Sequence, residues 1–164
     1  MGLLLCTRCA QHPFYYEKLD INLWSIQELS YVIYHYPIML PTDLVDRKLS
    51  GWIRDELHMG ILAAKLEQYM GSGEGGELQE RLLLMILRES NYYTQQEISY
   101  FETEYRRLRH IDRDQFYDLL GDAYFHMGRY GRAIEAYTES LHYLDSMLVK
   151  MKLGSACVTV MQFR

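Results

Sequence analysis

Cysteine is scarce in this chain, with three in 164 residues. An odd, low number argues against a disulfide-stapled secreted scaffold and favours a reducing compartment, so we expect a cytoplasmic protein. Cys6 and Cys9 have CxxC spacing with His12 nearby, but no second CxxC or paired histidine follows to complete the four ligands of a structural zinc site. A redox-active dithiol would need a βαβ setting, which the sequence does not predict. We therefore interpret Cys6 and Cys9 as core or surface thiols.

Long apolar runs are also missing. The apolar start, Met1–Cys6, ends at Thr7-Arg8 after a few residues and lacks a charged leader, so it does not read as a signal peptide. No stretch approaches the roughly 20 apolar residues that a membrane-spanning helix needs. We expect no membrane association.

Blocks of one charge sign are absent. Lys and Arg number 17 against 22 Asp and Glu, for a net charge of −5, and both signs are mixed along the chain. The one basic cluster comprises Arg106, Arg107, Arg109 and Arg113. It is largely neutralised by its acidic neighbours Glu102, Glu104, Asp112 and Asp114. Binding to nucleic acid or to anionic lipid is therefore not expected.

Motifs of catalysis and cofactor binding are lacking. The six histidines show no i, i+4 pair, and neither Gly-x-Ser-x-Gly nor a dinucleotide fingerprint occurs. Gly71–Gly76 is rich in glycine, but no Lys-Ser/Thr follows it and no strand precedes it, so we interpret it as a flexible connector. We predict no catalytic residue, no metal ligand and no cofactor, and hence a protein that is not an enzyme.

Apolar residues at helical spacing are what the chain does contain, and they make up nearly half of it (49%). Ser25–Glu28 and Thr94–Glu97 are capping boxes that open helices. The expected helices run from Ser25 to about Tyr36, over Thr42–Leu49, Gly51–Leu57, Ile61–Met70 and Glu77–Glu89, and from Thr94 to about Arg109. Pro13–Tyr16 is expected to be extended. The fold class predicted is all-α, built of antiparallel helical hairpins.

The clearest pattern lies between Asp114 and Asp145. Apolar residues recur at helical spacing over Gln115–Met127 and Tyr130–Tyr143, separated only by Gly128-Arg129, which is room for nothing but an antiparallel hairpin. Small residues, Gly121 and Ala133, allow the helices to approach closely, and the tyrosines at 124, 130 and 137 fill the space beside the crossing. Gly128 stands where the first helix must end in a left-handed turn.

These residues resemble one unit of the tetratricopeptide repeat (TPR). The match covers Leu120-Gly121, Ala123-Tyr124, Gly128, Tyr130, Ala133-Ile134, Tyr137 and Leu141. Leu153–Cys157 repeats the pattern of Leu120–Tyr124 about 33 residues later. We therefore divide the chain into an N-terminal helical region, 1–110, and a TPR-like region, 111–164, with a full repeat at 114–145 and a partial one at 147–164. The partial repeat is expected either to continue in a longer protein or to pack on another chain.

The resemblance implies a right-handed superhelix whose concave face takes a peptide or a partner helix. The implied contacts in the full repeat are Gln115, Asp118, Asp122, Phe125 and His126. In the partial repeat they are Leu148, Met151, Lys152, Ser155 and Thr159. The two aspartates lie one helical turn apart, and on this face ligand contact or solvation is preferred over acid–base catalysis. They favour a basic or a mixed polar–aromatic partner over one offering carboxylates.

Two alternatives stay open. The N-terminal region, with Ser25–Leu29 and Trp52–Leu57, resembles that of uncharacterised bacterial TPR proteins, a resemblance that carries no activity with it. A TPR-containing sensor or transcriptional regulator would need a helix-turn-helix over Ser25–Leu57. Its recognition helix, Leu49–Leu57, carries Arg54 but also Asp55 and Glu56. The second alternative is a homodimer formed through the C-terminal helix.

Overall fold

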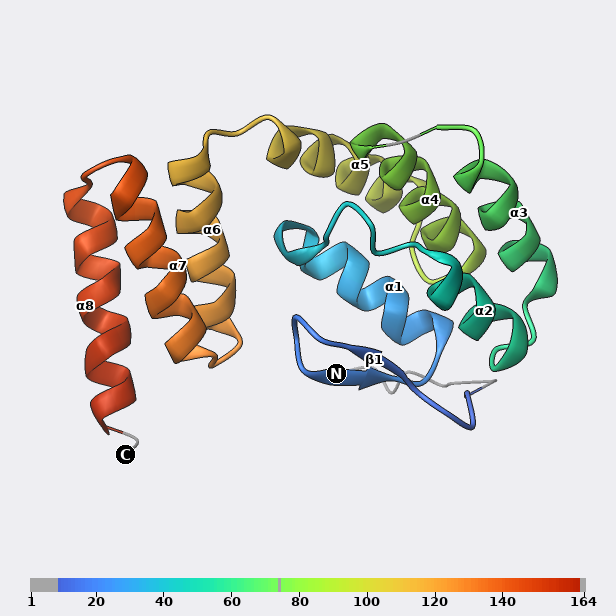
Figure 1. Ribbon diagram of the computed structural model, residues 1–164, viewed down its shortest axis with the longest axis horizontal. Coiled ribbons are helices and arrows are strands. Elements are labelled where there is room, and N and C mark those ends of the chain that lie inside the picture. The colour runs from blue at the N-terminus through green and yellow to red at the C-terminus, as the bar shows by residue number, and fades with distance from the viewer. Residues whose placement is uncertain (1–8, 74, 163–164) are drawn as a thin grey trace. The chain divides into compact units, whose positions relative to one another are not determined.

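The computed structural model describes residues 9–73 and 75–162, and these residues are predominantly helical (Figure 1). The all-α prediction is confirmed, with one small two-stranded sheet added. The elements are β1 (Phe14–Tyr16), β2 (Ile21–Leu23), α1 (Ile26–His35), the 3-10 helix η1 (Pro37–Met39), α2 (Arg47–Asp55), α3 (Gly60–Met70), α4 (Gly76–Glu89), α5 (Gln95–Arg109), α6 (Arg113–His126), α7 (Tyr130–Tyr143) and α8 (Met147–Gln162). None of the helices in these ranges is both long and apolar enough to cross a bilayer.

Contacts divide the chain into two compact units, an N-terminal unit, Met1–Tyr105, and a C-terminal unit, Arg106–Arg164. In the N-terminal unit the strongly apolar α4 packs against both α1 and α3. Its side chains at Leu82, Leu83, Ile86 and Leu87 are fully buried. Burial of each such side chain stabilises the fold by about 1.5–3 kcal/mol, so α4 organises this unit.

A hairpin precedes the helices. Pro13–Tyr16 was expected to be extended, and Phe14–Tyr16 is, but it also pairs antiparallel with Ile21–Leu23, in the register Phe14↔Leu23. Phe14, Tyr16 and Leu23 are buried. Strands of three residues are too short to show a period-two pattern, and for that reason the pairing was not predicted.

The capping box at Thr94–Glu97 is confirmed in full, whereas at Ser25–Glu28 the cap on Glu28 is present but the Glu28 carboxylate accepts from the Trp24 N–H and not from that of Ser25. The backbone N–H of Glu28 donates to Ser25 Oγ at 3.1 Å, and that of Glu97 donates to Thr94 Oγ1 at 3.2 Å. In return the Glu97 carboxylate accepts the Thr94 N–H at 2.7 Å. Because these bonds satisfy N–H groups that the first helical turn leaves free, they set where α1 and α5 begin.

The prediction of two helices at Thr42–Leu49 and Gly51–Leu57 is wrong. A single helix, α2, covers Arg47–Asp55 and runs straight through Gly51. Asp46 caps it, since its Oδ1 accepts the Leu49 N–H at 2.9 Å. Leu49, Trp52 and Ile53 are buried at helical spacing on either side of the glycine. Their packing outweighs the roughly 1 kcal/mol that glycine costs in a helix interior.

The C-terminal unit is a stack of three antiparallel helices, with α7 between α6 and α8 (Figure 1). Gly121 of α6 lies directly against the ring of Tyr137 on α7, and Ala133 is fully buried at the same seam. Gly128 has φ +75°, and the N–H groups of Gly128 and Arg129 bond back to the carbonyls of Phe125 and Tyr124 at 3.0 and 2.8 Å. This is a Schellman helix end, which confirms the predicted left-handed glycine.

Candidate functional site

The residues predicted to contact a partner all lie on α6 and α8 of the C-terminal unit. Gln115 and His126 on α6 are exposed, as are Met151 and Ser155 on α8. Phe125 is half-buried, with its ring edge-on to Tyr130 at 5.2 Å between centroids. We call this set, with Asp118 and Asp122, the α6–α8 face.

The two aspartates of this face already have partners within the chain. Lys152 Nζ lies 2.8 Å from Asp118 Oδ1 and 3.1 Å from Asp122 Oδ2. The other oxygen of Asp122 accepts a hydrogen bond from the Tyr137 hydroxyl at 2.7 Å. This charge network joins α6, α7 and α8, and it leaves a net charge of about −1 where the sequence pattern counted two free carboxylates. The expectation of a basic partner based on those two charges loses its support.

The electrostatics of the network follow from partial burial. Desolvation by itself lowers the pKa of Lys152, but hydrogen bonds to Asp118 and Asp122 outweigh it, so the pKa is raised. Burial and the hydrogen bond to Asp122 raise the pKa of Tyr137. Both groups therefore keep their protons at neutral pH, and Lys152 stays a cation between two carboxylates.

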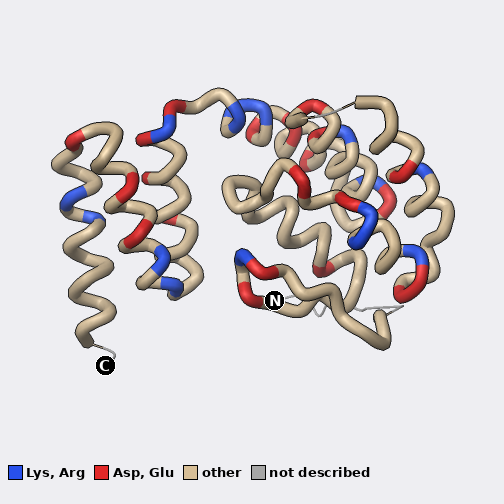
Figure 2. The backbone as a smooth tube through the Cα atoms, in the orientation of Figure 1, with Lys and Arg blue, Asp and Glu red and all other residues tan. Residues whose placement is uncertain are grey.

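The outer surface of α8 is apolar and unusually exposed. No Lys, Arg, Asp or Glu occurs from Leu153 to the end of α8 at Gln162, so that half of the helix is tan in Figure 2. The exposed apolar side chains on α8 are Met147, Leu148, Met151, Val158 and Met161. Val149 and Ala156, in contrast, are buried in the contact between α8 and the rest of the unit. Met151 belongs to both sets, so the exposed apolar surface of α8 continues into the α6–α8 face.

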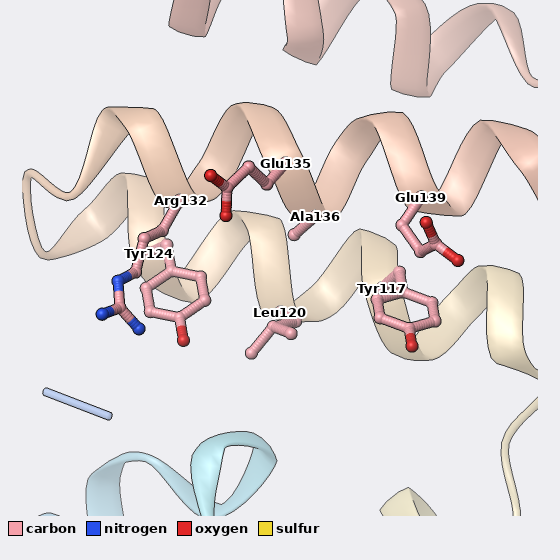
Figure 3. Close-up of a pocket in the computed structure, with 7 residues that line it drawn as sticks. All are labelled: Tyr117, Leu120, Tyr124, Arg132, Glu135, Ala136 and Glu139. Atoms are coloured by element: carbon pink, nitrogen blue, oxygen red, sulfur yellow. The ribbon is translucent and has the colours of Figure 1, made fainter. Parts of the chain in front are cut away.

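A pocket that the sequence analysis did not predict opens between α6 and α7 (Figure 3). Its volume is about 350 Å³, and its lining residues are Tyr117, Leu120, Tyr124, Arg132, Glu135, Ala136 and Glu139. Leu120 and Ala136 lie in the middle, with Arg132 beside Tyr124 and Glu139 beside Tyr117 (Figure 3). The Arg132 guanidinium stands 5.9 Å from the centre of the Tyr124 ring. The sequence contained one signal for this pocket, the i, i+3, i+7 spacing of Tyr117, Leu120 and Tyr124, which places these three side chains on one side of α6.

The proposed recognition helix of the regulator alternative falls on α2. Its cations take part in contacts within the N-terminal unit. Arg54 is paired with Glu67, and Lys48 lies 5.8 Å from the centre of the Phe14 ring. Leu49, Trp52 and Ile53 face the core. Arg54 is therefore less available to DNA phosphates, whereas Arg47 and Lys48 at the start of the helix are exposed.

The described residues also bear on the metal and thiol sites considered from the sequence. Among residues 9–73 and 75–162, no group of three or more His, Cys, Asp or Glu side chains gathers in a way that could hold a metal ion. Cys9 is disulfide-bonded, so its interpretation as a thiol is wrong. Cys6, the other half of the CxxC spacing, lies outside the described residues. Cys157, in α8, is free and half-buried.

No family model, curated protein or solved structure matches this chain. The resemblance to the TPR therefore remains a prediction from the sequence of residues 114–145.

Proposed function

We propose that this protein is a non-enzymatic interaction module that binds a peptide or partner helix on the α6–α8 face, in the manner of a TPR. The observation that carries the proposal is the close packing of Gly121 on Tyr137 and of Ala133 at the same seam. A glycine and an alanine at the crossing of two short helices, followed by a third antiparallel helix, is the packing that the repeat pattern requires.

The chemistry of the face indicates the class of partner. With Asp118 and Asp122 paired to Lys152, the exposed groups of the face are Met151, Ser155, Gln115 and His126, beside a residual charge of about −1. Apolar side chains beside polar hydrogen-bonding groups suit one face of an amphipathic helix, which would place apolar anchors against Met151. Recognition by long-range charge attraction is not needed for such a partner.

The test is partner capture by the full chain with photo-crosslinking. A photoreactive amino acid at Met151 should crosslink to a partner from the source cell, whereas the same group at the exposed Met161, near the end of α8, should do so far less. Met151→Glu should abolish capture and Met161→Glu should preserve it. Capture that Met161→Glu abolishes and Met151→Glu spares would reject the α6–α8 face.

Asp118 and Asp122 are poor choices for this test. Their replacement would leave Lys152 without its partners and break the charge network that joins α8 to α6, so that a loss of binding would report on folding. Substitutions at Met151 avoid this confusion because its side chain is 65% exposed.

The exposed apolar side chains of α8 favour one other candidate, a homodimer formed through this helix. Light scattering at increasing protein concentration distinguishes the two. A dimer that Met147→Glu and Met161→Glu together dissociate would support self-association, whereas a monomer at all concentrations would reject it.

A further inference from the structure

A continuous set of aromatic rings lies in the N-terminal unit, outside the face described above. Tyr34 of α1 stacks on Tyr93, with ring centroids 4.2 Å apart and 14° between planes. Tyr92 meets Tyr93 edge-on at 4.9 Å, and Tyr31 meets His35 at 4.1 Å. We call these five residues, Tyr31, Tyr34, His35, Tyr92 and Tyr93, the tyrosine cluster.

The cluster rests on the core and opens to solvent. Tyr34 contacts Phe101, which is 2% exposed, at 6.3 Å between ring centroids. Tyr31 and Tyr92 are 40% and 47% exposed, and Tyr100, which interacts electrostatically with Tyr34, is 66% exposed. The rings pack on the core on one side and are exposed to solvent on the other, so they are held rigidly. A partner that stacks on them therefore costs little side-chain entropy in the cluster. Tyrosine is for this reason enriched at interfaces.

The charge around the cluster is negative. Glu97, in the first turn of α5, interacts electrostatically with both Tyr34 and Tyr93. Burial lowers the pKa of His35, so its ring is uncharged at neutral pH and does not repel a cation. Within residues 9–73 and 75–162, no lysine or arginine stacks on Tyr31, Tyr34, Tyr92 or Tyr93. Tyr34 and Tyr93 cover each other's faces, so the ring surface left to a positive group from outside is that of the exposed Tyr31 and Tyr92, whose faces carry a negative quadrupole.

A buried hydroxyl adds to this picture. The Tyr93 Oη atom is shielded from solvent and has no hydrogen-bond partner among the described residues. An unsatisfied buried hydroxyl costs about 1–3 kcal/mol, so the tyrosine cluster is held in place at a cost to stability.

We propose that the tyrosine cluster is a docking site for an arginine side chain of a partner protein, whose guanidinium stacks on the exposed tyrosines and faces the Glu97 carboxylate. A planar, weakly hydrated guanidinium stacks on aromatic rings better than the compact, strongly hydrated ammonium of lysine. Nucleobases also stack on tyrosines, but their phosphates would meet Glu97 on a chain of net charge −5.

The experiment measures binding of a short fluorescein-labelled peptide in which arginine alternates with glycine. Three other probes are compared with it. Two are the same peptide with every arginine replaced by citrulline or by lysine, and the third is a labelled oligothymidylate. Citrulline keeps the size and planarity of arginine without its charge, although a carbonyl oxygen replaces one of its NH2 donors. The arginine peptide should bind more tightly than the citrulline and lysine peptides, by about two- to fivefold or more for each ring engaged.

Variants locate the site. Tyr92→Ala should weaken the arginine peptide by that factor, Tyr92→Phe should retain its binding because the ring remains, and Tyr69→Ala, another exposed tyrosine of the same unit, should change nothing. Glu97→Gln should weaken the arginine peptide but not the citrulline one. Glutamine also serves in a capping box, so α5 keeps its cap in this variant. Circular dichroism should be used to check that Tyr92→Ala is folded, and Tyr31→Ala provides a second truncation of an exposed ring.

Equal binding of the arginine and citrulline peptides would overturn the proposal, as would an arginine affinity that Tyr92→Ala leaves unchanged. Tighter binding of oligothymidylate with the same dependence on Tyr92 would assign the cluster to nucleic acid instead. Because the cluster and the α6–α8 face have no residue in common, failure of either proposal leaves the other standing.

Discussion

At the scale of single residues, Lys152 joins side chains from separate helices. Its ammonium reaches Asp118 and Asp122 on α6, and Asp122 in turn accepts the Tyr137 hydroxyl of α7. The side chains of Lys152 and Asp118 are only 26% and 24% exposed. Removing one partner of an ion pair that is this sheltered lowers the free energy of unfolding, because the other charge stays behind without its counterion.

We therefore predict that Lys152→Met destabilises the C-terminal unit by about 1–2 kcal/mol, measured by urea unfolding. The matched control is Lys150→Met, whose ammonium lies 2.7 Å from Asp145 between side chains that are 51% and 77% exposed. That exposed pair should contribute at most about 0.5 kcal/mol. Equal losses in the two variants would contradict the role given to the network.

The same residue predicts a dependence on alkaline pH. The folded pKa of Lys152 is raised, so the stabilisation it contributes is present in full below the unfolded pKa of about 10.4 and is lost as pH rises through the folded value. The raised pKa of Tyr137 acts in the same direction, since its hydroxyl must stay protonated to donate to Asp122. The free energy of unfolding of the native chain should fall above about pH 10 more steeply than that of Lys152→Met.

At the scale of elements, the three helices of the C-terminal unit use their glycines differently. A Cβ placed at Gly121 would overlap the Tyr137 ring, coming within 2.9 Å of Cζ and closer still to other ring atoms, whereas one at Gly154 would meet nothing within 4 Å. The two glycines occupy equivalent positions of the repeat pattern. Only the first is held by a neighbouring helix, so only there is glycine required by packing.

This contrast gives a paired prediction. Gly121→Ala should destabilise the protein by about 1–3 kcal/mol through overpacking against Tyr137. Gly154→Ala should leave stability unchanged or raise it by up to about 1 kcal/mol, since alanine is the better helix former. Thermal unfolding of both variants decides the matter, and a tolerated Gly121→Ala would reject the close crossing of α6 and α7.

The hairpin β1–β2 is preceded by a segment tied to α2 by one carboxylate. The N–H groups of Gln11 and His12 donate to Glu56 Oε2 at 3.1 and 3.0 Å, and Trp52 Nε1 donates to the His12 carbonyl at 2.9 Å. The hydrogen bond from the His12 backbone, with others, lowers the pKa of Glu56. The tether is therefore present above the unfolded pKa of glutamate and is lost as pH falls through the lower, folded one.

Glu56→Gln should loosen this tether, because a neutral amide accepts these bonds more weakly than a carboxylate. We expect faster hydrogen exchange at Gln11 and His12 in the variant at neutral pH, and lower protection factors at these two amides in the native chain at low pH, after correction for the slower intrinsic exchange there. Glu89→Gln, at an exposed pair with Lys65, is the control that should leave exchange at these sites unchanged. Unaltered exchange in Glu56→Gln would show that Trp52 by itself holds the segment.

At the scale of the whole molecule, charge is dispersed. Lysines and arginines alternate with acidic residues along the backbone, without a long stretch of one sign (Figure 2). The net charge of −5 and a pI near 5.7 make the chain an anion at neutral pH. Its long-range field therefore repels polyanions and attracts cationic partners weakly, a property of the whole chain that no single site determines.

We predict that the protein passes through a heparin column at neutral pH and moderate salt, because its field is repulsive to sulfate groups. Retention that decreases with added salt would reveal a basic surface and would revive the DNA-binding alternative for the N-terminal unit. A chain with Arg106, Arg107 and Arg109 changed to glutamine would then show whether that cluster is responsible.

Much of the helical framework follows from neighbouring residues. The caps at Ser25 and Thr94, the left-handed turn at Gly128 and the small residues at the α6–α7 seam are local signals, each completed within a few residues of the chain. Helix starts, helix ends and the antiparallel hairpin could therefore be predicted. At Gly51 the local signal, a glycine, predicted a break between two helices. The packing of the buried residues on either side of it outweighed this signal, and a single helix forms.

Side-chain partnerships were decided by the tertiary structure alone. The chain order places Lys152 on the same predicted face as Asp118 and Asp122, but only the packing of α8 brings its ammonium to both carboxylates. The tyrosine cluster likewise joins α1 to residues that lie almost sixty positions later. Hydrogen bonds and helix periodicity act between near neighbours, whereas charge pairing and ring stacking depend on distances that only the folded backbone sets. The sequence by itself thus determined the helices, and their packing determined which of its charges and rings remain available to a partner.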